Sequence, residues 1–284
     1  MKNIISLSIY FLIFINSNAQ NISNSITITD VEWDKSSPAS FMQLQIPSES
    51  SLLQGFMYKA NNSQKHPTLI MLHGYPGNER NLDLAQIVRA KGWNVIYFNY
   101  RGSWGSQGDF SFKNCIKDVI NLVDFCYKNS KELQIDTSNI VLFGHSMGGW
   151  VGLKALQQLP NVKKGFMLST WDIYGDFKDV KTEQQLDNLI KEWELQIFVL
   201  NTPAKELYKD VIRNIDFYNL SNDGKSLADK NIVMLDEHSL NKGIALSMEN
   251  ENNLSFKYDV WNTDHSFTNK RISLANLVLN FLND

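Results

Sequence analysis

The pentapeptide at residues 144–148, with the sequence GHSMG, constrains the fold of this chain more than any other feature. It follows the apolar run 139–143, which has the length and composition of a buried strand. The residues after Ser146 are apolar at helical spacing, so this serine is predicted to lie on a sharp turn from a strand into a helix. Glycine at both ends of the pentapeptide suits such a turn, because the backbone can pass close to its neighbours without a Cβ clash. The Ser146 hydroxyl would then stand at the edge of a sheet, where a substrate and a base can reach it.

Strand-like and helical patterns alternate along the rest of the chain. Strands are predicted at 27–33, 41–46, 52–59, 68–73, 94–99, 139–143, 164–169, 231–235 and 255–261. Amphipathic helices are predicted at 81–91, 112–127, 147–159 and 270–282. The first three strands follow one another directly, whereas the later ones are separated by helices. This order predicts an α/β protein with a mostly parallel, mixed sheet that begins with antiparallel strands and is flanked by helices.

The segment 171–230 departs from this alternation. Two helical patterns stand there in place of a strand and a helix, and the second is expected to begin with Thr202 as its N-cap and Pro203 at its first helical position. The segment is rich in aromatic residues, most of which we expect to pack it onto the core. Because it follows a predicted sheet strand, we interpret it as a helical cap over the site.

A serine hydroxyl is a weak nucleophile, so it needs a base within hydrogen-bond reach and a third group that orients the base. Of the five histidines, His265 lies directly after the last predicted strand and before the last helix. That position predicts a loop at the carboxyl edge of the sheet, the same edge as Ser146. His145 adjoins the serine and is expected to point elsewhere. We therefore predict His265 as the base.

The acid is expected after the preceding strand, and the run 231–235 leads directly into Asp236 and Glu237. Asp236 is the first choice. Glu237 is its immediate rival, and Asp172 is a third candidate because it follows the strand 164–169 at the same edge. The order of Ser146, Asp236 and His265 along the chain is nucleophile, acid and base, which differs from the orders in chymotrypsin-type and subtilisin-type proteases.

The negative charge that develops on the attacked carbonyl oxygen requires backbone N–H donors. The N–H of Met147 is one candidate, because it follows the nucleophile at the start of a helix. The N–H of Tyr75 is the other, because the glycine-containing turn 73–77 follows a predicted strand and can fold toward Ser146.

These motifs together resemble the α/β-hydrolase fold family, in its serine esterase and peptidase branch. The resemblance rests on His73-Gly74, on 99–106, on the turn at 144–149 and on 264–267, and it extends over about residues 40–284. It implies Ser146 as nucleophile, His265 as base, and Tyr75 and Met147 as oxyanion donors. Members usually have a glycine-containing turn before the aspartate, which this chain lacks. The resemblance also implies that Arg101 pairs with a carboxylate instead of binding substrate.

The expected activity is hydrolysis of a carboxylic ester through an acyl-enzyme, with no metal or organic cofactor. A serine peptidase acting on short peptides is the alternative, and a ligand-binding protein without catalysis is a third reading on the same fold. The net charge of −3 and the lack of a basic cluster argue against nucleic acid or an anionic membrane surface as a partner.

Residues 1–19 have the pattern of a secretory signal peptide. Lys2 precedes the apolar run 4–15, and Ser17, Asn18 and Ala19 are the kind of residues that precede a cleavage site. We expect a secreted or periplasmic protein whose mature part, 20–284, is one hydrolase domain without a stable membrane anchor. Cys115 and Cys126 fall on one predicted helix, about 16 Å apart along its axis, which is too far for a disulfide. They are expected to be free, buried thiols.

Overall fold

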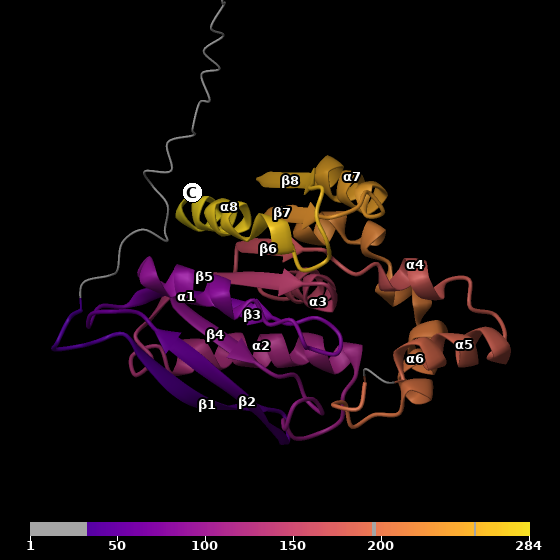
Figure 1. The fold of residues 1–284 in the computed structure, drawn as a ribbon, viewed down its shortest axis with the longest axis horizontal. Coiled ribbons are helices and arrows are strands. Elements are labelled where there is room, and N and C mark those ends of the chain that lie inside the picture. Colours follow the sequence, from indigo (N-terminus) through magenta and orange to yellow (C-terminus); the bar gives the residue numbers. More distant parts are fainter. Residues whose placement is uncertain (1–32, 195–196, 253) are drawn as a thin grey trace, which may run out of the picture. The chain divides into compact units, whose positions relative to one another are not determined.

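The computed structural model describes residues 33–194, 197–252 and 254–284. The predicted signal peptide and all but the last residue of the predicted strand 27–33 lie outside these ranges. Every element described below belongs to the compact unit 31–284 (Figure 1). Among the described residues, no helix combines the length and the apolar character needed to cross a bilayer.

One mixed sheet forms the centre of this unit. Its strands are β1 (Ser40–Ser48), β2 (Ser51–Lys59), β3 (His66–Leu72), β4 (Asn94–Phe98), β5 (Ile135–His145), β6 (Lys164–Leu168), β7 (Asn231–Asp236) and β8 (Ser255–Val260). They lie in the order β1-β2-β4-β3-β5-β6-β7-β8. β1 pairs antiparallel with β2, and β2 pairs antiparallel with β4. From β4 to β8 all neighbours are parallel, so the predicted sheet is confirmed.

The burial of the strands explains their sequence patterns. In β1 and β2 buried and partly exposed residues alternate, which is typical of strands with one face on the core. All residues of β4, and nearly all of β3, β6 and β7, are buried. These strands are continuously apolar because helices cover both of their faces. The parallel half of the sheet is therefore a rigid support for the loops at its carboxyl edge.

The helices around the sheet are α1 (Leu82–Ala90), α2 (Phe112–Lys128), α3 (Met147–Leu156), α7 (Lys242–Glu251) and α8 (Arg271–Asn283). α2 packs against α3, and α1 packs against α8. Four of these helices were predicted, whereas α7 was not. Cys115 and Cys126 are both buried in α2 as free thiols, as predicted.

Between β6 and β7 the chain inserts a run of helices and 3₁₀ turns. They are α4 (Ile173–Phe177), α5 (Glu183–Trp193), α6 (Ala204–Arg213), η1 (Ile215–Tyr218), η2 (Leu220–Asn222) and η3 (Gly224–Leu227). Figure 1 shows α4, α5 and α6 grouped beside the sheet. The predicted start of the second helical pattern is wrong by one residue. Pro203 occupies the cap position and α6 begins at Ala204. The Thr202 hydroxyl instead donates a hydrogen bond to the Phe110 carbonyl oxygen.

Candidate active site

Ser146 lies on a strained turn between β5 and α3. Its backbone has φ 57° and ψ −120°, a conformation that a residue with a Cβ rarely adopts. The flanking glycines are required by sterics. A Cβ on Gly144 would lie 2.2 Å from the Gly148 carbonyl oxygen, and one on Gly148 would lie 2.0 Å from the Leu72 carbonyl oxygen. The predicted strand-to-helix turn is therefore confirmed, and backbone packing against β3 holds it in shape.

The loop after β3 comes against this serine. A Cβ on Gly74 would lie 3.0 Å from the Ser146 Cβ and 3.5 Å from its Oγ. In the described part of the chain, the backbone N–H groups of Tyr75 and Met147 donate to no protein acceptor. Met147 follows Ser146 in the chain, and Tyr75 follows Gly74, the residue whose backbone contacts Ser146. Both N–H groups are free to bind an oxyanion that forms on a carbonyl attacked by Ser146.

His265 lies on the loop after β8 and lines the same cavity as Ser146. Its Nδ1 is 2.7 Å from the Oε1 atom of Glu237. No hydrogen bond joins the Ser146 hydroxyl to another described residue. Hydrogen bonds between catalytic groups are often long before substrate binds. That Ser146 and His265 line one cavity is therefore the observation that links them.

Of the three candidate acids, the structure places Glu237 against His265 and the first choice, Asp236, elsewhere. Asp236 is fully buried, and its Oδ2 accepts a hydrogen bond from Asn241 Nδ2 at 3.1 Å. Burial, which outweighs that hydrogen bond, raises the pKa of Asp236 to about 6. Glu237, the next residue, lies in the bend just after the end of β7 and meets His265. The third candidate, Asp172, is the N-cap of α4, where its side chain accepts from the Gly175 N–H at 2.9 Å.

Glu237 is held ionised. Burial of its carboxylate raises the pKa, but hydrogen bonds from His265 and Ser169 more than offset this, and the pKa falls to about 2. The His238 Nε2 is 3.8 Å from the same carboxylate. An ionised carboxylate only accepts hydrogen bonds, so Nδ1 of His265 must carry the proton between them. In the neutral ring Nε2 of His265 is then the acceptor, which is the form a general base needs.

His145 supports the loop that carries His265, a role that was not predicted. Its Nε2 is 2.9 Å from the His265 carbonyl oxygen, and its Nδ1 is 3.3 Å from the Asn81 side-chain nitrogen. The amide nitrogen of Asn81 can only donate, so His145 accepts at Nδ1 and donates from Nε2. Burial lowers the pKa of His145 to about 4, which keeps the ring neutral and this tautomer in place.

Arg271 extends this support. Its Nη1 donates to the Asn81 side-chain oxygen at 2.9 Å and to the Ser266 carbonyl oxygen at 3.0 Å. Its Nε and Nη2 bind the carboxylate of Asp83. The hydrogen bonds thus run from the start of α8 through Asn81 and His145 to the backbone of the histidine loop. Arg101, by contrast, pairs with Asp118 and Glu49, as expected of a structural residue.

The cavity beside Ser146 measures about 340 Å³. The insertion between β6 and β7 contributes Trp171, Asp172, Asp176 and Trp193 to its lining. Tyr75 contributes a third aromatic ring. The segment predicted as a cap therefore lines the cavity that also contains Ser146.

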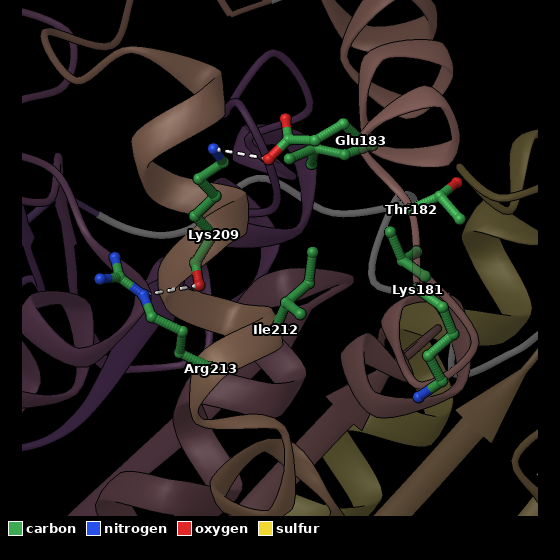
Figure 2. Close-up of a pocket in the computed structure, with 8 residues that line it drawn as sticks. Lys181, Thr182, Glu183, Lys209, Ile212 and Arg213 are labelled. Atoms are coloured by element: carbon green, nitrogen blue, oxygen red, sulfur yellow. Dashed lines mark hydrogen bonds and ion pairs between the residues drawn. The ribbon is translucent and has the colours of Figure 1, made fainter.

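A second cavity, of about 370 Å³, lies between α5 and α6. Figure 2 shows Lys209 reaching across it to Glu183, with 2.9 Å between the ammonium nitrogen and the carboxylate oxygen. None of the predicted site residues lines it. Within 33–194, 197–252 and 254–284, no three His, Cys, Asp or Glu side chains gather in a way that could hold a metal ion.

Comparison with known proteins gives one matching family model and several similar proteins. The BD-FAE family model matches residues 56–188. The alpha/beta hydrolase domain-containing protein WAV2 of Arabidopsis thaliana is 31% identical over 123 residues, which are 43% of this chain and 39% of that protein. The chain spans less than half of the length of the curated relatives it matches.

Two similar solved structures come from archaea. The esterase Pf2001 of Pyrococcus furiosus superposes with a TM-score of 0.61 at 19% identity, over 86% of this chain and 94% of that one. The acylaminoacyl peptidase of Pyrococcus horikoshii superposes with a TM-score of 0.63 at 17% identity, over 86% of this chain and 41% of that one. At these identities the likeness concerns the fold.

Proposed function

We propose that this chain, which has the α/β-hydrolase fold, is a serine hydrolase that cleaves carboxylic esters with Ser146, His265 and Glu237. The observation that carries the proposal is the geometry around His265. The ring is bonded through Nδ1 to an ionised carboxylate at 2.7 Å and shares a cavity with a serine on a strained turn. This combination of nucleophile, base and orienting acid is the arrangement that activates a serine hydroxyl.

In the first step, Nε2 of His265 takes the proton from Ser146 while Oγ attacks the carbonyl carbon of the ester. The oxyanion is bound by the N–H groups of Tyr75 and Met147, and Glu237 stabilises the positive imidazolium that forms. His265 then gives the proton to the departing alcohol oxygen as its bond to carbon breaks. An acyl group is left on Ser146.

In the second step, His265 takes a proton from a water molecule, whose oxygen attacks the acyl carbon. The bond to Ser146 breaks, the proton returns to the serine oxygen, and the carboxylic acid leaves. Each half of the reaction uses the same base and the same oxyanion donors, and the second half consumes one water molecule.

The test is hydrolysis of p-nitrophenyl acyl esters of increasing chain length by the purified protein and by Ser146→Ala. We expect turnover by the wild-type protein and loss of turnover in the variant. Equal activity of the two proteins would contradict the proposal. A protein that folds but neither turns over nor reacts at Ser146 would instead support the reading as a ligand-binding protein.

A serine peptidase acting on short peptides is the second candidate, supported by the structural likeness to an acylaminoacyl peptidase. The same residues would act, with His265 protonating the departing amine. Hydrolysis of aminoacyl anilides measured beside the esters separates the two. A higher kcat/KM for anilides than for matched esters would favour the peptidase.

We further propose that the protein is exported by its N-terminal segment, on the sequence pattern of residues 1–19. Expression of the full chain in a bacterial host with a Sec pathway, followed by N-terminal sequencing of the periplasmic form, tests this. We expect the mature chain to begin near Gln20. A chain that stays in the cytosol with Met1 intact would contradict it.

A further inference from the structure

The cavity beside Ser146 has an unbalanced charge. Asp172 and Asp176 both line it, and no lysine or arginine is among the described residues that do so. The lining also contains two histidines, His238 and His265, and the carboxylate that bonds to His265, that of Glu237, is not among the lining residues.

The pKa of Asp172 is raised, first by burial and also by the neighbouring Asp176, against the hydrogen bond from the Gly175 N–H and the charge of Lys178, which both lower it. The cavity thus has two carboxylates in its lining, each of which already accepts one hydrogen bond, Asp172 from the Gly175 N–H and Asp176 from the Trp171 indole.

Asn241 adds a buried acceptor to this lining. Its Nδ2 donates to the Thr170 carbonyl oxygen at 2.7 Å and to Asp236 at 3.1 Å, which fixes the orientation of the amide. Its Oδ1 has no hydrogen-bond partner among the described residues, although Asn241 is only 1% exposed. A buried acceptor without a partner is costly. A ligand in this cavity would relieve that cost by bringing a donor.

Aromatic rings complete the wall. Trp171 and Trp193 stack with 6.2 Å between ring centroids, and Tyr75 lies 5.6 Å from Trp171 and 5.8 Å from Trp193. The Trp171 indole N–H donates to Asp176 at 2.6 Å, so ring and carboxylate are held together. Aromatic faces attract cations, and the attraction grows where water is excluded.

From these contacts we propose that the substrate carries a positively charged ammonium group, bound between the aromatic rings and the two carboxylates beside Ser146. This inference rests on the proposed hydrolase function and narrows its substrate class. An ammonium group brings charge for Asp172 and Asp176, a cation for the rings of Trp171 and Trp193 and, where it carries N–H, a donor for Asn241. A neutral hydrocarbon of the same shape brings none of these.

The ammonium group can lie on the acyl or on the alcohol side of the ester, so the experiment uses one matched pair for each. On the acyl side, the p-nitrophenyl ester of aminohexanoate is compared with that of heptanoate. On the alcohol side, choline butyrate is compared with dimethylbutyl butyrate, its uncharged carbon analogue. We expect kcat/KM to favour the cation by about ten-fold or more in at least one pair. Equal values, or preference for the neutral ester in both pairs, would overturn the inference.

Substitution of Asp172 and Asp176 tests whether their carboxylates contribute to the preference for a cationic substrate. Asp172→Asn keeps an N-cap side chain for α4, and Asp176→Asn keeps an acceptor for the Trp171 indole. Each is expected to lower the ratio of cationic to neutral kcat/KM by about two- to five-fold, the range of a partly exposed charge pair. Asp179→Asn is the matched control, because this exposed aspartate is near in sequence but is not among the lining residues. A ratio that falls equally in the control would show a general effect of charge and overturn the assignment.

A separate readout distinguishes failure of this inference from failure of the proposed function. Covalent labelling of Ser146 by an uncharged fluorophosphonate reports the nucleophile alone. Tryptophan fluorescence titrated with choline, against dimethylbutanol as the neutral control, reports cation binding without catalysis. Labelling with no preference for choline would leave the hydrolase and remove the ammonium site. Choline binding without labelling would leave the ammonium site and remove the hydrolase.

Discussion

Ser146 and His265 line one cavity, yet the chain holds them in different ways. The serine is positioned by backbone packing, with Gly144 and Gly148 too close to neighbouring carbonyl oxygens for any side chain. The histidine lies on an exposed loop and is positioned by polar side chains, of which Glu237 and His145 touch it directly. Packing tolerates no added volume, whereas a set of hydrogen bonds can be weakened in steps. Substitutions at the serine turn should therefore affect stability, whereas substitutions around His265 should lower the rate by graded amounts.

The largest effect is expected at the serine turn. Gly148→Ala would bring a Cβ to 2.0 Å from the Leu72 carbonyl oxygen, so it should lower the free energy of unfolding by about 3 kcal/mol or more. Gly243→Ala is the control. It lies in α7 with nothing within 4 Å of the added atom, and alanine there should stabilise the helix by up to about 1 kcal/mol. Chemical denaturation measures both. A Gly148→Ala protein as stable as wild type would show that the turn is not held by packing.

The next effect separates the two adjacent carboxylates. Glu237→Gln removes the charge that faces His265 and should lower kcat by about 10²- to 10⁴-fold, the range that general acid–base catalysis contributes. Asp236→Asn keeps an acceptor for Asn241 and should leave kcat within a few-fold of wild type. Steady-state kinetics on one ester decide. If Asp236→Asn were the slower enzyme, the geometry at His265 would be misassigned.

A smaller effect is expected at Arg271, which acts through Asn81 and the histidine loop. Arg271→Met keeps the length of the side chain and removes its donors, so kcat should fall by about ten-fold, less than the roughly 10²-fold that a 1 Å displacement costs. KM should change little, because Arg271 does not line the cavity. Asp83→Asn is the control, since it removes the exposed ion pair but leaves the bonds to Asn81 and Ser266. Equal loss in both variants would mean that the ion pair, not the loop, matters.

The last effect concerns acid stability. The pKa of Glu237 in the folded chain is about 2, below its ordinary value of 4.5. The folded state therefore binds this proton less readily, and the stability that Glu237 contributes is complete above about pH 4.5 and lost as the pH falls toward about 2. In Glu237→Gln the free energy of unfolding should depend less on pH between about 4.5 and 2. Unfolding free energies measured across that range test it, and parallel curves for the two proteins would contradict the assignment.

The sequence allowed the fold and the serine turn to be predicted, because both are encoded locally. Apolar runs of strand length alternate with amphipathic helices, and the pentapeptide lies where a strand meets a helix. Differences arise where the local signal is weak. β5 begins at Ile135 instead of residue 139, because the buried Ile135 is followed by residues 136–139, which are polar and partly buried or exposed. Helix α7 was missed because its apolar residues are few and glycine and serine lie among them.

The acid could not be assigned from the sequence for a physical reason. Whether Asp236 or Glu237 faces the histidine depends on where β7 ends, because Asp236 is its last residue and Glu237 lies in the bend that follows. In a strand with one exposed face, alternating polar residues would reveal the direction of each side chain. In β7, residues 232–236 are all buried, so no alternation of apolar and polar residues indicates which face a given side chain points to. The hydrogen bonds of His145 and Arg271 could not be predicted from the sequence either. They join residues that lie 120 positions apart, in His145 and His265, and 190 positions apart, in Asn81 and Arg271.

Covalent labelling of Ser146 tests the central claim most directly. The folded protein is treated with a fluorophosphonate, and the modified residue is located by peptide mass spectrometry, with Ser146→Ala and heat-unfolded protein as controls. We predict one adduct per chain, on Ser146, which both controls lack. A folded protein that takes up no adduct, or carries it on another residue, would contradict the assignment of Ser146 as the nucleophile.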